Sequence, residues 1–305
     1  MKTLQSRKTQ YRTMIILFLA PITLLYAIFF IYPAAQSFYI SFYDWSGFGD
    51  NMRFIGLNNY REILGDTNIW GVAVPNTLRL IFVGGLLVFG LSFLLSGILT
   101  TKIRGRKVLR AILFFPAILS PVAVAILWGF IYNRQWGLLN NFLGVIGLES
   151  LQRTWGAPDT LFWSILVAYV WMSTGLFCVI LVAGLDRIPV SLLEAADIEG
   201  ASEFRKFFTI KLPLLREILT TALILWSIQA VREFSLFFAW GGGIDIPPEG
   251  AQNLAVRMYI TAFGRRTPIF RMGYATTIGV LMFVLIAVIV FTIYWLNRKH
   301  ETIEY

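Results

Sequence analysis

The sequence predicts an all-α, polytopic membrane protein with six transmembrane helices. Hydrophobic residues make up 57% of the 305-residue chain and charged residues only 14%, a composition far from that of soluble domains. Six stretches with few or no ionisable side chains are each long enough to cross a bilayer, which takes about 20 mainly apolar residues. No soluble core would bury six such lengths, so the membrane is the expected environment.

The first expected span, residues 13–43, follows four basic residues near the N-terminus. A basic segment before an apolar run is also typical of a signal peptide, here with a cleavage site near Ala34 and Ala35. The run exceeds the roughly 7 to 15 apolar residues of a cleaved signal peptide, so we interpret it as an uncleaved span. The other expected spans are residues 80–101, 111–133, 160–185, 218–244 with an interruption at Arg232 and Glu233, and 272–297.

Lysine and arginine predict the orientation, because they accumulate in the cytoplasmic connections of membrane proteins. With both termini in the cytoplasm, the inner segments carry 16 basic residues and the outer segments carry 8. We therefore predict that segment 102–107 and the loop around Gly200 are cytoplasmic and that segment 147–153 is external. The net charge of +9 then reflects topology, and no nucleic-acid partner is needed to explain it.

Catalytic and metal-binding chemistry is not expected in this chain. Cys178 is the one cysteine and His300 the one histidine, whereas metal sites and acyl-transfer sites need several converging ligands or a base beside a nucleophile. The sequence contains no phosphate-cradling P-loop pattern. We predict no catalytic residue, no metal and no cofactor in this chain, so that any ATP is bound by another subunit.

The connection 186–217, between the fourth and fifth expected spans, predicts two short helices joined at a bend. Ser191 and Glu194 have the spacing of a capping box, which predicts that a helix follows Ser191. Gly200 can end that helix in a left-handed conformation, and Ser202 can cap a second helix that stops before Pro213. An acidic first helix and a basic, phenylalanine-rich second segment suit docking on a protein, but equally an amphipathic hairpin on the inner leaflet.

The spacing of this loop resembles a known motif. Glu194-Ala195-Ala196, three residues, Gly200, nine residues, Ile210, one residue and Leu212-Pro213 match the EAA loop of binding-protein-dependent ABC importer permeases at its defining positions. Segments 32–45, 55–64, 114–132 and 136–143 resemble the maltose and glycerol-3-phosphate type of sugar permease. The sequence departs from that subgroup after the fifth span, where Phe234-Ser235 and 240–244 (WGGGI) replace its usual residues.

The resemblance implies a type I ABC importer permease in the bacterial inner membrane, with residues 1–305 forming one transmembrane permease domain. It further implies a second homologous permease subunit, two cytoplasmic ATPase subunits that bind ATP and Mg, an external solute-binding protein and the surrounding lipid. The implied function is translocation of a sugar or a related polyol or glycoside. The residues expected to couple the chain to the ATPases are Glu194, Ala195, Ala196, Gly200, Ala201, Ile210, Leu212 and Pro213.

A path for solute is expected between the fourth and fifth spans. At about 1.5 Å per residue, Ser173 and Gln229 both lie ~17–18 Å from the inner ends of their spans, near the bilayer midplane. Tyr169 shares a helix face with Ser173, while Trp226 and Glu233 share one with Gln229. Aromatic rings, amides and carboxylates suit a polyol.

Other interpretations of these polar residues stay open. The same groups could instead hold the spans together or bind the partner permease, which is the role we favour for Arg232. Arg232 and Glu233 form the charged pair within a span, so an ion-coupled secondary transporter of a small polar solute is the alternative function. A membrane enzyme is a weaker alternative, because only carboxylates such as Glu233 remain as candidate catalysts.

Overall fold

The computed structural model describes residues 2–100, 104–241, 247–264 and 269–297. Within them the helices are α1 Lys2–Tyr26, α2 Tyr32–Ile40, α3 Asn58–Gly65, α4 Val74–Arg79, α5 Gly85–Thr100, α6 Arg106–Phe114, α7 Pro121–Ile131, α8 Leu138–Val145, α9 Leu161–Leu185, α10 Val190–Ile198, α11 Glu203–Lys206, α12 Leu212–Leu214, α13 Arg216–Arg232, α14 Ser235–Trp240, α15 Leu254–Phe263 and α16 Met272–Asn297. Strands β1 Tyr43–Asp44 and β2 Arg53–Phe54 form a small antiparallel hairpin that the all-α prediction did not include.

The spans match the predicted polytopic architecture, with corrections to the second and third spans. By length and composition, five continuous helical runs could cross a membrane: Thr13–Ile40, Ile69–Thr100, Leu161–Leu185, Arg216–Trp240 and Met272–Asn297. The third predicted span, 111–133, is not one straight helix. It is a pair, Arg106–Ile118 and Pro121–Ile131, bent by 102°, and it makes a sixth span if the pair is counted as one. The last residues of the predicted stretch 218–244 lie outside the described residues.

Three prolines inside the helical runs are accommodated by π-helical turns. Pro33, Pro75 and Pro213 each follow such a turn by two residues: the turns are Ala27–Ile31, Ile69–Ala73 and Phe207–Lys211. In each case the amide of the residue before the proline bonds to a carbonyl five residues back, as Leu212 does to Phe207. The wider turn makes room for a ring that would clash with the carbonyl four residues back. The prediction that the second loop helix stops before Pro213 is therefore wrong, because the chain stays helical through α12.

The second span begins at Ile69 rather than at Leu80. The predicted stretch without ionisable residues began only after Arg79. Arg79 nevertheless lies inside the helical run and contacts other residues there. Its Nη1 donates to Asn76 Oδ1 at 3.1 Å, and its guanidinium lies 5.9 Å from the centroid of the Phe162 ring. An arginine that is bonded and stacked can lie within a span, so a count of ionisable residues placed this boundary too late.

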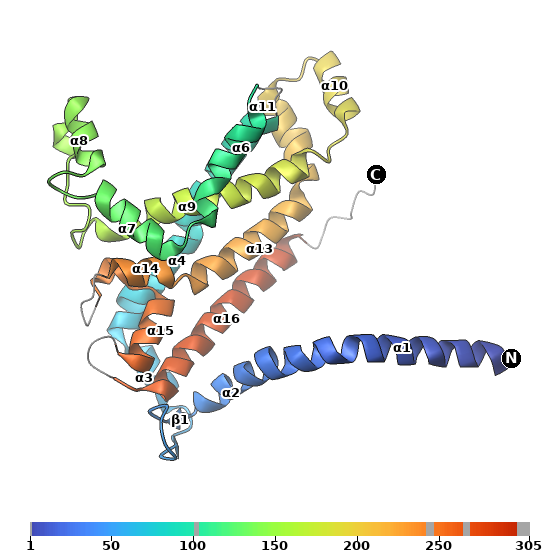
Figure 1. Cartoon of the computed structure of the whole chain (residues 1–305), viewed down its shortest axis with the longest axis vertical. Helices are drawn as coiled ribbons and strands as arrows, with labels where there is room; N and C mark the ends of the chain where they lie inside the picture. The colour runs from blue at the N-terminus through green and yellow to red at the C-terminus, as the bar shows by residue number, and fades with distance from the viewer. Residues whose placement is uncertain (1, 101–103, 242–246, 265–268, 298–305) are drawn as a thin grey trace.

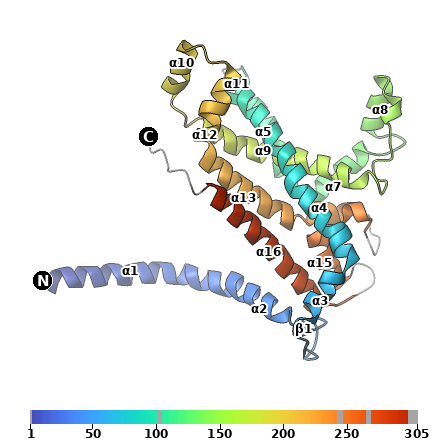
Figure 2. The ribbon, with the colours of Figure 1, turned by 180° about the vertical axis from the view of Figure 1, so that it is seen from behind.

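The core of the bundle forms around α9, which packs on α5, α6 and α13, while α16 packs on α13 and α15. Sixteen of the 25 residues of α9 are buried, which makes it the central helix of the described bundle. A Cβ at Gly175 would collide with the carbonyl oxygen of Leu113, so glycine allows the backbones of α9 and α6 to touch. Figures 1 and 2 show α9 crossing the middle of the molecule between α5 and α7.

The two ends of the bundle carry different structures. The hairpin of β1 and β2 and helix α3 lie at one end, and α10 and α11 lie at the opposite end beside the start of α6 (Figures 1 and 2). Helix α1 runs away from the bundle in both views, and no residue in the most apolar part of the Thr13–Ile40 run is buried by the rest of the chain. The run returns to the bundle at α2, where Phe38 contacts Phe283 of α16 edge to face at 5.3 Å.

Candidate functional site

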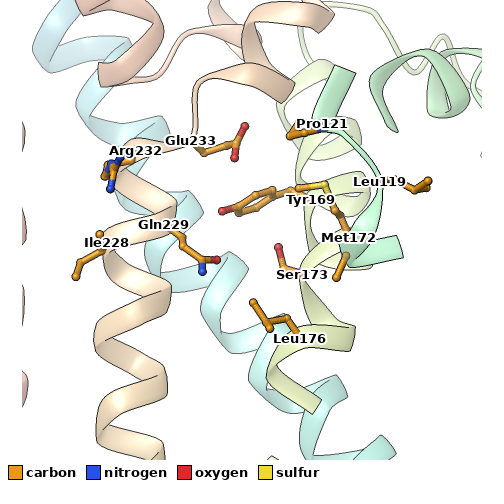
Figure 3. A pocket seen from close by; sticks show the side chains of 11 residues that line it. Leu119, Pro121, Tyr169, Met172, Ser173, Leu176, Ile228, Gln229, Arg232 and Glu233 are labelled. Atoms are coloured by element: carbon orange, nitrogen blue, oxygen red, sulfur yellow. The ribbon is translucent and has the colours of Figure 1, made fainter. Parts of the chain in front are cut away.

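A cavity of about 390 Å³ lies between α9, α13 and the bend that separates α6 from α7. Figure 3 shows Tyr169 and Ser173 of α9 facing Gln229 and Glu233 at the end of α13. The lining residues are Ala117, Leu119, Pro121, Tyr169, Met172, Ser173, Leu176, Ile228, Gln229, Arg232 and Glu233. Four of the five residues predicted for the solute path therefore line one cavity.

Two breaks in the helices border this cavity. The first is at Leu119 and Ser120, whose extended backbone separates the 3-10 turn Phe115–Ile118 from α7. Ser120 Oγ accepts a hydrogen bond from the amide of Ala123 and so caps α7. Non-helical backbone at membrane depth is tolerated where it lines a cavity or is buried in protein. The bend thus brings Leu119 and Pro121 to the cavity wall.

The second break is at Glu233, where ψ of 110° ends α13. Glu233 Oε1 accepts a hydrogen bond from the amide of Leu236 at 2.9 Å, and its carbonyl accepts one from the side-chain amide of Asn253. The carboxylate therefore lies at the first turn of α14, where the free backbone amides favour negative charge. The charged interruption that the sequence showed within this span is a structural break that faces the cavity.

Trp226 does not line the cavity, unlike the other predicted path residues. Its side chain is 1% exposed, and its Nε1 donates to the carbonyl of Ile81 at 2.8 Å. A Cβ at Gly85 would approach that nitrogen to 2.7 Å, so a glycine is needed for the indole to fit. The ring also contacts Tyr169 at 5.4 Å between centroids. Trp226 thus packs against Tyr169 in the core. Its expected contact with solute stays a prediction.

Arg232 lines the cavity, although from the sequence we favoured a role in holding the spans together or binding the partner permease. Leu119, Pro121 and Met172 were not singled out from the sequence either. The adjacent Ser120 and Pro121 were a usable signal, because proline after a capping serine is typical of a helix start. Met172 follows Tyr169 by three residues, and this helical spacing was a second signal, because it places both side chains near one face of the helix.

The loop predicted to couple the chain to ATPases is a helical hairpin. Gly200 has φ of +73°, and the amide of Ala201 bonds to the carbonyl of Ala196 at 2.9 Å while that of Gly200 bonds to Asp197 at 3.0 Å. This pair of bonds is a Schellman motif that ends α10 at a left-handed glycine. Ser202 Oγ accepts from the amide of Arg205 and caps α11. The predicted bend at Gly200 and the cap at Ser202 are both confirmed.

The predicted capping box at Ser191 and Glu194 is wrong. Helix α10 begins at Val190 after Pro189, and no side chain caps it. Because proline fixes its backbone near φ of −65°, it can lead into a helix without a side-chain cap. Glu194 and Ala195 are therefore free of a capping role, and both are exposed on the hairpin, whereas Ala196 is buried.

An ion-pair network holds the two arms of the hairpin together. Lys206, whose side chain is 7% exposed, donates to Asp197 of α10 at 2.6 Å and pairs with Glu203 of α11. Lys211 pairs with the other oxygen of Glu203 at 3.2 Å. The hydrogen bond to Asp197, followed by that to Glu203, raises the pKa of Lys206. The hydrogen bonds from Lys206 and Lys211 lower the pKa of Glu203.

Apolar side chains cover the outer surface of this hairpin. Ile198 is 89% exposed at the end of α10 and Phe204 is 76% exposed on α11, beside the exposed Phe208. Phe204 and Phe208 contact each other, with centroids 4.7 Å apart. An exposed apolar cluster next to charged residues is typical of a surface that contacts another protein or a membrane.

The hairpin is joined tightly to the helices that line the cavity. Phe207 packs edge to face on Phe93 of α5 at 5.4 Å. The chain stays helical from Phe207 to Leu214, and the next residue, Leu215, is buried directly before α13 begins. A Cβ at Gly184, near the end of α9, would collide with Leu215 and Ile218, so these ends of α9 and α13 are in close contact. A displacement of the hairpin would therefore reach both cavity-lining helices.

Comparison with known proteins agrees with this architecture. The chain is 35% identical to the trehalose/maltose transport system permease protein MalF of Thermococcus litoralis, with 92% of each chain covered, and 27% identical to the multiple sugar-binding transport system permease protein MsmF of Streptococcus mutans, with 91% and 93% covered. A bacterial ABC transporter involved in the import of alginate matches the fold with a TM-score of 0.78 at 20% identity, covering 99% of this chain and 100% of that chain. Residues 92–301 match the family model of the binding-protein-dependent transport system inner membrane component. The chain therefore belongs to this family of multi-pass inner-membrane transport components, which are permeases rather than enzymes.

Proposed function

We propose that this chain is the permease subunit of an ATP-driven importer that carries a sugar or a related polyol or glycoside. The solute arrives on an external binding protein, the partner that the family description implies. The names of the relatives MalF and MsmF support a sugar as the solute. The observation that carries the proposal is the cavity itself, in which a hydroxyl, an amide, a phenol and a carboxylate face one space inside the bundle.

The chemistry of the cavity suits a polyol. Gln229 can both donate and accept, Ser173 and Tyr169 carry hydroxyls, and Glu233 has an oxygen besides the one that accepts from Leu236. The lining also includes Leu119, Met172 and Leu176, which give the apolar contact that the carbon face of a sugar needs. The cavity thus offers both kinds of surface that a sugar presents.

The hairpin of α10 and α11 is the proposed coupling element. Two ATPase subunits on the cytoplasmic side bind ATP and Mg, and a second homologous permease completes the membrane domain. The residues proposed to contact or position the ATPases are those of the EAA motif, and its exposed members Glu194, Ala195, Gly200 and Pro213 are available for direct contact. Coupling requires that the ATPases bind the hairpin differently in two conformations of the permease. The close contact of Leu215 and Ile218 with Gly184 offers the route to α9 and α13.

Uptake into proteoliposomes tests this function. The complete transporter is reconstituted with its ATPases, second permease and binding protein, and uptake of the solute that copurifies with the binding protein is measured with and without ATP. We expect ATP-dependent uptake that persists when proton and sodium gradients are abolished. Uptake driven by either gradient without ATP would overturn the proposal in favour of a secondary transporter.

Two substitutions test the cavity. Gln229→Ala removes the amide, and Glu233→Gln removes the charge while keeping an oxygen that can accept from Leu236. We expect Gln229→Ala to lower uptake about 2- to 13-fold and Glu233→Gln to lower it further, since a lost hydrogen bond to solute costs ~0.5–1.5 kcal/mol and more for a charged group. Gln135→Ala and Glu149→Gln make the same changes at exposed positions outside the cavity and serve as controls. Unchanged uptake kinetics in both cavity variants, with normal complex yield, would remove this cavity from the path.

A further inference from the structure

Arg232 is a cation without a partner at the edge of the cavity. It lies in the Arg216–Trp240 run and is exposed to the cavity. In the part of the chain that the structure describes, no carboxylate oxygen lies within 4.0 Å of its guanidinium nitrogens, and these nitrogens make no hydrogen bond. Charged side chains within spans are costly and mark functional sites or partner contacts.

Arg79, which lies inside the helical run Ile69–Thr100, is in contrast satisfied by the chain itself. Arg79 donates to Asn76 and lies over the ring of Phe162. Arg232 has no equivalent contact, although Glu233 is its neighbour in sequence. The carboxylate of Glu233 instead accepts from the amide of Leu236 at 2.9 Å, at the start of α14. The two adjacent charges therefore do not neutralise each other directly.

The two side chains also point in different directions. Figure 3 shows the carboxylate of Glu233 on the side of α13 that faces Tyr169, and the Arg232 side chain on the other side of the helix. Both residues line the cavity. An anionic group at Arg232 would be kept apart from Glu233, while neutral hydroxyls of the same solute could reach Gln229 and Ser173.

We propose that the solute is an anionic glycoside, whose carboxylate, sulfonate or phosphate binds Arg232 while its hydroxyls bind Gln229 and Ser173. The guanidinium offers a planar pair of donors that matches such groups in geometry, and its hydrogen bonds to them are charge-assisted. A cation within a span that lacks a counter-ion from its own chain gains from a solute that supplies one. This inference rests on the proposed function and narrows its substrate class.

The test compares two solutes that differ in one group. Methyl β-D-glucuronide carries a carboxylate where methyl β-D-glucoside carries a hydroxymethyl group. Binding of each to the assembled transporter in nanodiscs, without the binding protein, is measured by saturation-transfer NMR titration. The 6-sulfonate and 6-phosphate analogues of the glucoside are further arms, and their rank beside the glucuronide identifies the preferred anion.

We expect the parent to bind at least one anionic solute about 10- to 100-fold more tightly than the glucoside, the range of a charge-assisted hydrogen bond. Arg232→Gln should abolish this preference with little change for the glucoside, and Arg232→Lys should retain part of it. The preference should shrink as NaCl is raised. Arg134→Gln, which removes an exposed arginine outside the cavity, should behave as the parent.

Several outcomes would overturn the inference. Equal affinity for charged and neutral solutes, or no saturable binding of any anionic solute, removes the assignment. A loss of assembled complex in Arg232→Gln, with the surviving complex showing the parental preference, would instead show that Arg232 pairs with an acidic residue of the partner permease. ATP-dependent uptake of the binding protein's own solute is measured separately. A transporter that passes that test and fails this one keeps the proposed function and loses only the anionic substrate class.

Discussion

Gly200 is the position at which a single side chain should separate coupling from folding. Its φ of +73° lies in the left-handed region, and a Cβ placed there would meet no atom within 4 Å. The cost of Gly200→Val is therefore conformational and not steric: about 1–2 kcal/mol for a left-handed residue with a Cβ. That cost equals a roughly 5- to 30-fold shift against the native bend. The Schellman bonds from Gly200 and Ala201 are lost with it.

The assay measures three quantities on the complete transporter: complex yield, ATPase activity stimulated by the loaded binding protein, and solute uptake. Gly200→Val should insert normally but bind the ATPases weakly or lose stimulation and uptake. Gly200→Asn should lie near the parent, because asparagine tolerates the left-handed conformation. Gly90→Val adds the same side chain at an exposed position of α5, where a Cβ also meets nothing within 4 Å, and should be tolerated. Parental yield, stimulation and uptake in Gly200→Val would refute the coupling role of this bend.

Three further predictions concern the hairpin, the broken span and the topology. The lowered pKa of Glu203 means that its ion pairs stabilise the hairpin fully above the ordinary glutamate pKa of 4.5 and lose this effect at lower pH. The raised pKa of Lys206 means that its ion pairs stabilise the hairpin fully below the ordinary lysine pKa of 10.5 and lose this effect at higher pH. Hydrogen exchange of residues 190–215 should therefore show constant protection between pH 4.5 and 10.5 and a loss of protection outside this range. Lys206→Met should weaken that protection at neutral pH, and an unchanged exchange profile would contradict the network. Gly175→Ala should push α6 from α9 and destabilise the complex by ~1–3 kcal/mol in thermal unfolding, whereas Gly129→Ala, with open space at its Cβ, should not. In a Cys178→Ser background, an impermeant maleimide on intact cells should label Glu149→Cys and not Arg104→Cys; the reverse pattern would invert the topology.

Local patterns determined much of this fold from the sequence. A span must be apolar over about 20 consecutive residues, so the fourth and sixth predicted stretches, 160–185 and 272–297, agree with α9 and α16 to within one residue. The bend at Gly200 and the cap at Ser202 were also predictable. Each depends on the conformational freedom or side-chain reach of one residue, which is the same in any tertiary context.

Features that depend on contacts between distant segments could not be predicted in this way. The adjacent Ser120 and Pro121 permit a break, but the 102° bend is a property of how α6 and α7 pack on α9, including the close approach of Gly175 to Leu113. The predicted second span began only after Arg79, because the sequence does not show that Phe162, far along the chain, contacts this arginine. Glu203 is a local partner of Lys206, three residues away on one helix, but Asp197 reaches Lys206 only after the chain turns at Gly200.

The sequence by itself determined that the chain is a membrane protein with a helical hairpin between its fourth and fifth spans. It also selected one set of polar and aromatic residues for the solute path: Tyr169, Ser173, Trp226, Gln229 and Glu233. Helical spacing gives the angles between side chains on one helix but not the rotation of that helix against its neighbours. Only the tertiary structure decided that rotation. The Trp226 indole packs against Gly85 and the carbonyl of Ile81 and therefore lies in the core. The break at Glu233 leaves Arg232 at the edge of the cavity without a partner in its own described chain.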